Sequence, residues 1–193
     1  MAPGSQGATS ANREFETRWE EIMVERPRRL GLLPDEAKGM SASTLEKLDV
    51  LAGLDLAMAR KSFLARHQDE KPYIDALERE LKRFLSLPLF VPNPSGRFAP
   101  SLLVDELWHD LILNTAQYRR MCDAVYGAYL DHTPNQEELD EASAGAVVDF
   151  THSALNKYYG SLDLSIWGSD IAVPCYPPPP APARSPQRPD GQG

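Results

Sequence analysis

The chain has 193 residues, a formal net charge of -8 at pH 7, 42% hydrophobic residues and 25% charged residues. This composition is typical of a water-soluble protein with one domain-sized hydrophobic core. Because the chain is acidic and has no basic block, we expect neither nucleic acid nor a membrane as a partner. No run approaches the roughly 20 apolar residues of a membrane-spanning helix. The first residues lack the apolar core of a secretory signal, so we expect a cytoplasmic protein.

The two ends of the chain differ in composition from its middle. Residues 1–10 are small and polar, and residues 173–193 are rich in proline. We therefore predict that both ends are disordered and that residues 11–172 form a single helical domain. Cys122 falls in a predicted helix and Cys175 in the Pro-rich tail, a placement that does not favour a structural disulfide.

Apolar residues recur at intervals of three and four along the N-terminal half, which is the spacing of helices with one buried face. This spacing predicts helices over residues 13–26, 41–64 and 71–87, a loop over residues 27–40 and a Pro-rich connector over residues 88–100. The second helix has two candidate caps, Ser41 and Ser43, and Glu46 completes a capping box with Ser43.

The next predicted helix opens at Pro100 or Ser101 and runs to about Asn114. Thr115 is a candidate cap for its continuation through Tyr129. These two segments carry most of the residues on which a functional hypothesis can be built.

The last long helix is predicted to start at Thr133, with proline and glutamine in its first turn, and to run to about Tyr159. Gly160 is its expected stop, and a short segment over residues 162–171 follows. The chain shows no pattern of strands and turns. The elements together predict an all-α fold, a compact bundle of about five helices.

One polar pair lies within the helix expected at residues 101–114. Asp105 and His109 are four residues apart and therefore share a helix face. Apolar residues surround them, and only Glu106 and Asp110 form a polar strip. A helix that is apolar nearly all round is buried, so we expect both side chains to point into protein or a closed cavity. A carboxylate in such a place must be paired, protonated or bound to a metal.

Further donors follow in the next segment. Tyr118 and Cys122 share a face of their helix, and His132 lies just beyond it. Packing of the two segments as an α-hairpin would bring together four metal-type donors: Asp105, His109, Cys122 and His132. Two imidazoles, a thiolate and a carboxylate suit zinc, iron or copper. A shared ion requires donor atoms closer than about 5 Å.

A structural explanation is also open. A buried aspartate often bonds a nearby histidine, and a lone cysteine facing a core is usually a small hydrophobe. We expect His67 to be exposed, and His152 to be satisfied or half-exposed, although it is a spare ligand. Trp108 and Trp167 are expected core residues.

The run from Val104 to His109, with the residues after it, resembles the core motif of glycine-rich domain-containing proteins and their small bacterial relatives. That motif is approximately Val-Asp-x-x-Trp-His, then a Tyr, a Cys, a Gly and a terminal His. It covers residues 104–133 here, and residues 80–170 more loosely. The Gly-rich regions of the plant members are absent, so their stress and RNA-related roles are not carried over. The resemblance implies that these residues belong to one site: Asp105, Trp108, His109, Tyr118, Cys122 and His132.

The leading hypothesis is a small metal-dependent enzyme, of a tailoring type, that acts on a small molecule or peptide. A divalent transition metal (iron, zinc or copper) would be held by Asp105, His109, His132 and Cys122. Tyr118 or Glu106 would serve as acid or base, and Cys122 is also a candidate reactive thiolate.

Two alternatives are open from the sequence. In the first, Cys122 is the nucleophile of a metal-free enzyme, with His109 or His132 as its base. Asp105 would orient that base. In the second, the helical domain is a non-catalytic interaction module that docks through the Pro-rich stretch at residues 177–180. The sequence favours no particular oligomeric state.

Overall fold

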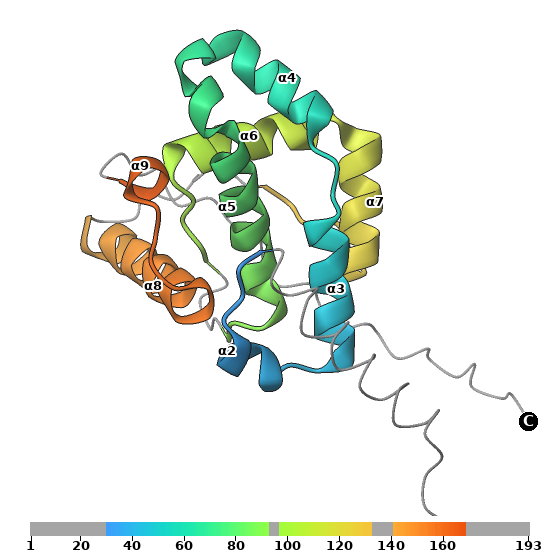
Figure 1. The fold of residues 1–193 in the computed structure, drawn as a ribbon, viewed down its shortest axis with the longest axis vertical. Helices are drawn as coiled ribbons and strands as arrows, with labels where there is room; N and C mark the ends of the chain where they lie inside the picture. Colours follow the sequence, from blue (N-terminus) through green and yellow to red (C-terminus); the bar gives the residue numbers. More distant parts are fainter. Residues whose placement is uncertain (1–29, 93–96, 133–140, 169–193) are drawn as a thin grey trace, which may run out of the picture.

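The computed structural model describes residues 30–92, 97–132 and 141–168, and this part of the chain contains helices and no β-strand (Figure 1). The expected all-α class is therefore confirmed. The helix expected over residues 13–26, the helix start at Thr133 and both tails lie outside the described residues. None of the described helices is both long and apolar enough to cross a membrane.

The N-terminal part of the described chain contains three short helices: α2 (Pro34–Lys38), α3 (Ala42–Ala52) and α4 (Ala57–Arg66). The prediction of a loop over residues 27–40 is therefore wrong in part, because α2 forms inside it. The prediction of one helix over residues 41–64 is also wrong, since two helices occupy that stretch.

Local hydrogen bonds explain where α3 begins and where the chain breaks before α4. The hydroxyl of Ser41 accepts the backbone N–H of Thr44 at 3.1 Å, so Ser41 is the cap and the capping box expected at Ser43 is not formed. Gly53 follows the last residue of α3. Asp55 then accepts the backbone N–H of Ala57 at 2.9 Å, which satisfies a donor at the start of α4.

Helix α5 (Ile74–Ser86) lies in the middle of the molecule and packs against α3, α6 and α8 (Figure 1). A 3₁₀ turn (Gln68–Tyr73) precedes it and another (Leu87–Leu89) follows it. The helix expected over residues 71–87 is thus confirmed in its centre and replaced by tighter turns at its ends. Its buried face contributes apolar side chains to the core, among them Leu77, Leu81, Phe84 and Leu85.

A buried polar network joins α5 to both ends of the described chain. Glu80 is only 1% exposed, accepts a hydrogen bond from Trp167 Nε1 at 2.9 Å and pairs with Arg83 Nη1 at 2.8 Å. Arg83 Nε donates to the carbonyl of Leu30 at 2.5 Å, and the guanidinium lies over the ring of Tyr159. We call this set the Glu80 network. It fixes segments that lie far apart in the sequence around one central helix.

Helices α6 (Leu102–Leu113) and α7 (Thr115–Tyr126) follow each other with a single residue between them. The hydroxyl of Ser101 caps α6 by accepting a backbone N–H of its first turn at 3.3 Å, as the sequence predicts. Gly127 ends α7 with a φ of 72°, a left-handed conformation that glycine adopts without strain. The expected continuation to Tyr129 is therefore wrong.

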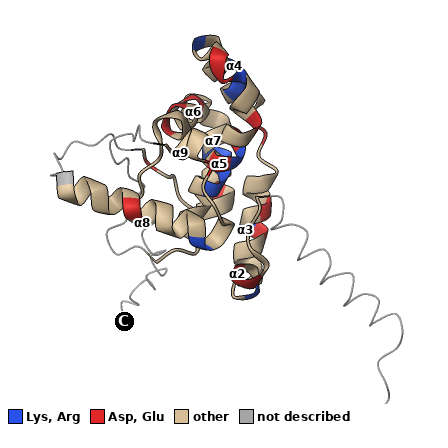
Figure 2. Cartoon of the chain, turned by 60° about the vertical axis from the view of Figure 1, so that its left-hand side comes forward, with Lys and Arg blue, Asp and Glu red and all other residues tan. Residues whose placement is uncertain are grey.

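The last described elements are α8 (Glu141–Tyr159) and α9 (Leu164–Trp167), which lie on one side of α5 (Figure 1). The predicted stop at Gly160 is confirmed, and its φ is 83°. Helix α8 carries few charged residues, whereas the charged residues of α4 are all basic and α5 carries both acidic and basic ones (Figure 2).

Candidate metal centre

Two ion pairs hold α6 against α4. Arg66 bonds both carboxylate oxygens of the buried Asp110, with N–O distances of 3.1 and 2.8 Å. His67 Nε2 contacts the carboxylate of Glu106, and the imidazole stacks on Phe63. The predicted polar strip of α6 therefore faces α4. The expectation that His67 is exposed is wrong, because this partnership leaves 27% of its side chain accessible.

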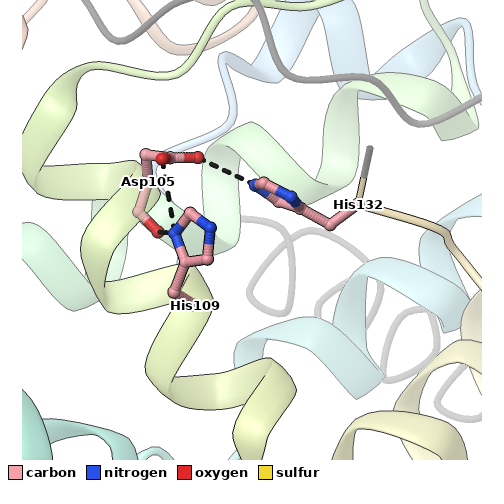
Figure 3. Close-up of side chains that lie close together, drawn as sticks. All are labelled: Asp105, His109 and His132. Atoms are coloured by element: carbon pink, nitrogen blue, oxygen red, sulfur yellow. Dashed lines mark hydrogen bonds and ion pairs between the residues drawn. The ribbon is translucent and has the colours of Figure 1, made fainter. Parts of the chain in front are cut away.

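Three of the expected ligands meet beside α6. Asp105 and His109 come from successive turns of that helix, and His132 comes from the segment that follows α7 (Figure 3). His132 Nε2 lies 3.0 Å from Asp105 Oδ1, and His109 Nδ1 lies 3.3 Å from Asp105 Oδ2. One donor atom from each residue can be chosen so that all three lie within 4.8 Å of one another. We call this set the Asp105 cluster.

The Asp105 cluster is closed on one side and open on the other. The side chains of His132 and Asp105 are 6% and 11% exposed, whereas that of His109 is 48% exposed. The expectation that both residues of the helical pair are enclosed is thus correct for Asp105 and wrong for His109. Leu102 and Leu113, two of the apolar residues around the pair, are exposed as well. They share the outward face of α6 with His109.

The orientation of His109 is set by its own helix. Its Nδ1 lies 2.8 Å from the backbone carbonyl oxygen of Asp105, one turn earlier. A carbonyl can only accept, so Nδ1 carries the proton in this bond. The other ring nitrogen, Nε2, then keeps its lone pair when the imidazole is neutral.

His132 is placed by contacts with the core. Its ring meets the edge of Trp108 at a centroid distance of 4.6 Å and lies 4.3 Å from the ring of His109. Two residues earlier, the carbonyl of Leu130 accepts a hydrogen bond from the hydroxyl of Tyr118 at 2.7 Å. That hydroxyl also accepts the indole N–H of Trp108 at 3.3 Å. The buried Trp108 is therefore a core residue, as expected. It bonds Tyr118 and contacts the ring of His132.

The structure does not bring Cys122 into the Asp105 cluster. Its thiol is completely buried on α7, and it is not among the described residues whose donor atoms group with Asp105. Burial raises the pKa of this thiol, an effect that the backbone N–H of Leu130 and the hydroxyl of Tyr118 offset only in part. A buried thiol with a raised pKa is a poor ligand and a poor nucleophile at neutral pH. The convergence expected for Cys122 is wrong, and its burial disfavours the metal-free Cys/His enzyme.

The two acid–base candidates also lie apart from the cluster. Glu106 is engaged by His67. Tyr118 is fully buried, and this burial raises the pKa of its hydroxyl well above the ordinary value. Neither group is placed to exchange protons with a substrate beside His109.

Two further predictions concern residues away from the Asp105 cluster. His152 packs against the edge of Trp167, with 5.8 Å between ring centroids, and burial lowers its pKa. It is thus a partly buried histidine, as expected, and not a member of the cluster. Cys175 and the Pro-rich stretch at residues 177–180 lie outside the described residues.

Sequence reasoning did not identify the partners that hold the Asp105 cluster in place. Arg66 and Tyr118 each bond a residue that is not on their own helix, and such pairs follow from tertiary packing. For Arg66 the only available signal was the charge of the polar strip it faces. For Tyr118 the signal was its place in the motif, which does not reveal that its role is to bond a backbone carbonyl.

A comparison with protein-family models matches residues 42–148 to the UCP032817-like family. The match spans more than half of the chain and includes every member of the Asp105 cluster. No curated protein matches the chain, and no solved structure matches it either. The chain belongs to the UCP032817-like family.

Proposed function

We propose that this member of the UCP032817-like family binds a divalent transition metal through Asp105, His109 and His132. We further propose that it is a metal-dependent enzyme acting on a small molecule or peptide. The observation that carries the proposal is the meeting of one carboxylate and two imidazoles, whose donor atoms lie within 4.8 Å of one another. Two histidines and a carboxylate with further positions open are a ligand set used for non-haem iron and for catalytic zinc.

The spacing of the donors supports a shared ion. Ligand atoms bound at about 2.0–2.2 Å lie roughly 3.0–3.6 Å from their neighbours around an octahedral or tetrahedral ion. The 3.0 Å between His132 Nε2 and Asp105 Oδ1 fits this range. His109 is the most exposed member, with 48% of its side chain accessible, so it borders the open side of the set.

The charge balance around Asp105 supports a cation as well. Two other buried carboxylates, Glu80 and Asp110, are each paired with an arginine. The ion-pair partners of Asp105 among the described residues are two imidazoles, and no arginine or lysine of the described part pairs with it. A buried carboxylate is costly unless a positive charge or strong hydrogen bonds compensate it. A divalent ion would supply that charge.

The orientation of His109 is the one that metal-binding histidines usually have. Its Nδ1 donates to the backbone carbonyl of Asp105 at 2.8 Å, so the lone pair of the neutral ring is on Nε2. Such a bond from the non-ligating nitrogen fixes the ring and raises its basicity as a ligand.

The open side of the Asp105 cluster favours a catalytic site over a structural one. Structural zinc sites are closed by four protein ligands, whereas catalytic sites keep a position for water or substrate. The described residues supply three ligands here, and the side chain of His109 is 48% exposed. A small molecule or an extended peptide could therefore approach the ion from this side.

The test is metal binding by the purified full-length protein. We expect about one equivalent of metal per chain after expression in metal-supplemented medium, measured by elemental analysis. We expect His109→Ala to lower the affinity for Zn²⁺ at least 100-fold in a calorimetric titration, because a direct ligand is lost. His152→Ala is the matched control. It also removes one imidazole, but from α8, and should leave the affinity unchanged.

Two results would overturn the proposal. The first is wild-type protein with less than about 0.1 equivalent of metal and no measurable binding of Zn²⁺, Fe²⁺ or Cu²⁺. The second is an equal loss of affinity in the His109 and His152 variants, which would place the ion elsewhere. Either outcome would leave the Asp105 cluster as a hydrogen-bonded structural feature.

A further inference from the structure

The placement of His132 requires an explanation, because this residue does not belong to a helix. It follows Gly127 in a segment without regular structure, yet only 6% of its side chain is exposed and it lies 3.0 Å from Asp105. A side chain on a loop holds one position only where the backbone of that loop is anchored to the rigid elements beneath it.

The anchor visible in the structure is a chain of two buried hydrogen bonds. Trp108 Nε1 donates to the Tyr118 hydroxyl at 3.3 Å, and this hydroxyl donates to the carbonyl of Leu130 at 2.7 Å. The side chains of Trp108 and Tyr118 are fully buried, and Leu130 is 2% exposed. The bond thus crosses from the first turn of α7 to the loop, two residues before His132.

We propose that Tyr118 is a positioning residue: its hydroxyl fixes the carbonyl of Leu130 and thereby holds the imidazole of His132 beside Asp105. Trp108 supports this arrangement at both ends, by its hydrogen bond to Tyr118 and by its edge contact with His132. The functional meaning of this inference rests on the proposed metal site, in which His132 is a ligand.

The hydroxyl is the part of Tyr118 that matters here. Substitution by phenylalanine keeps the ring and its packing, but it leaves the carbonyl of Leu130 and the indole N–H of Trp108 without their partner. Buried polar groups that lose a hydrogen-bond partner shift toward water or toward another partner. The nearest part of the chain that can move is the loop carrying His132, because Trp108 lies within α6.

The same helix offers a matched control. The hydroxyl of Tyr126, which is 9% exposed at the end of α7, donates to the carbonyl of Leu85 at 2.5 Å. Tyr126→Phe therefore removes the same chemical group and the same kind of bond from α7, but at a contact with α5. Thermal denaturation of both variants shows whether each remains folded.

Two measurements separate positioning from general stability. In metal-free protein, the side-chain ¹H–¹⁵N signals of His132 should shift or broaden in Tyr118→Phe and stay unchanged in Tyr126→Phe. In titrations with Zn²⁺, Tyr118→Phe should lower the affinity about 10- to 100-fold, the range typical of groups that orient a ligand. Tyr126→Phe should bind as the wild type does.

The outcomes distinguish this inference from the proposed metal site. His132 signals that move only in Tyr118→Phe support positioning, even when the wild type binds no metal and the proposed function fails. His132 signals that stay unchanged in Tyr118→Phe overturn the inference, whatever the wild type binds. So does an equal change in both variants, or a Tyr118→Phe protein that does not fold while Tyr126→Phe does, because Tyr118 would then have a purely structural role.

Discussion

The Asp105 cluster and the Glu80 network compensate a buried carboxylate in different ways. Each contains a buried carboxylate that needs compensation. Glu80 is paired with the permanent charge of Arg83 and accepts the indole N–H of Trp167. Asp105 has two imidazoles as its ion-pair partners in the described part of the chain. The first arrangement is complete without any ligand, whereas the second gains most from an added cation.

Their positions match this difference. The Glu80 network lies in the centre of the molecule, and Glu80 is only 1% exposed. The Asp105 cluster lies at the edge, where His109 reaches solvent. A network that joins distant segments is expected to contribute mainly to stability. A cluster with an open side is expected to contribute mainly to binding.

The largest expected effect on stability is therefore in the Glu80 network. Glu80→Gln keeps the shape of the side chain but leaves the guanidinium of Arg83 without its counter-charge. We expect this change to lower the free energy of unfolding by about 3 kcal/mol, since breaking a buried ion pair leaves an uncompensated charge.

In the Asp105 cluster, the variant that corresponds to Glu80→Gln is Asp105→Asn. In metal-free protein it should lower the free energy of unfolding by about 1 kcal/mol, because the two imidazoles that contact Asp105 can also bond an amide. Urea denaturation of both metal-free variants measures this ranking. A larger loss for Asp105→Asn than for Glu80→Gln would contradict the comparison.

The sequence predicted the helical class and several helix ends because those depend on local chemistry. Ser101 at the start of α6 and Gly160 after α8 act through bonds and torsions within a few residues. The division of residues 41–64 into α3 and α4 was not predicted. The apolar pattern continues across Gly53, so it does not reveal the break before α4, where Asp55 accepts the backbone N–H of Ala57.

The Asp105 cluster was predicted in part for a similar reason. The spacing of Asp105 and His109 along one helix puts them on one face, and the position of His132 just beyond the next helix added the third residue. The sequence did not show that His109 faces solvent, because a helical wheel does not say which side meets the rest of the protein. Cys122 was misplaced because its helix turns that side chain into the core.

The next largest loss of stability is expected at two glycines with left-handed backbone conformations. Gly31 has a φ of 74°, and a β-carbon there would collide with Arg83 Nη2 of the Glu80 network. Gly127 has a φ of 72°, but a β-carbon would meet no atom within 4 Å. We expect Gly127→Ala to cost about 1 kcal/mol from backbone strain alone, and Gly31→Ala to cost about 2 kcal/mol or more.

Equilibrium urea denaturation of the two alanine variants checks this order. A second measurement shows where the strain acts. Gly127 begins the segment that carries His132, so Gly127→Ala should also weaken Zn²⁺ binding, whereas Gly31→Ala should not. Equal stability losses would mean that the side chain of Arg83 moves away without cost, and that the Glu80 network is less rigid than its contacts indicate.

The smallest expected effect concerns His152 on α8, which packs against Trp167. Burial beside Trp167 lowers the pKa of His152 from its ordinary value of 6.5, and the charge of Asp149 opposes this only in part. The unfolded chain therefore binds a proton at a higher pH than the folded protein does. Stability should fall as the pH drops from about 7 toward 5, because protonation then favours the unfolded state.

His152→Gln removes this titration and should make the stability less dependent on pH. The measurement is the free energy of unfolding of wild type and variant at pH 7.5 and 5.5, both in metal-free protein. The wild type should lose more stability over this interval than the variant does. An identical loss in both proteins would show that His152 accepts its proton in the folded state as easily as in water, so that its contact with Trp167 does not exclude solvent. The surroundings of His152 and Trp167 would then be open to solvent. The contrast between an enclosed Glu80 network and an exposed Asp105 cluster would not hold.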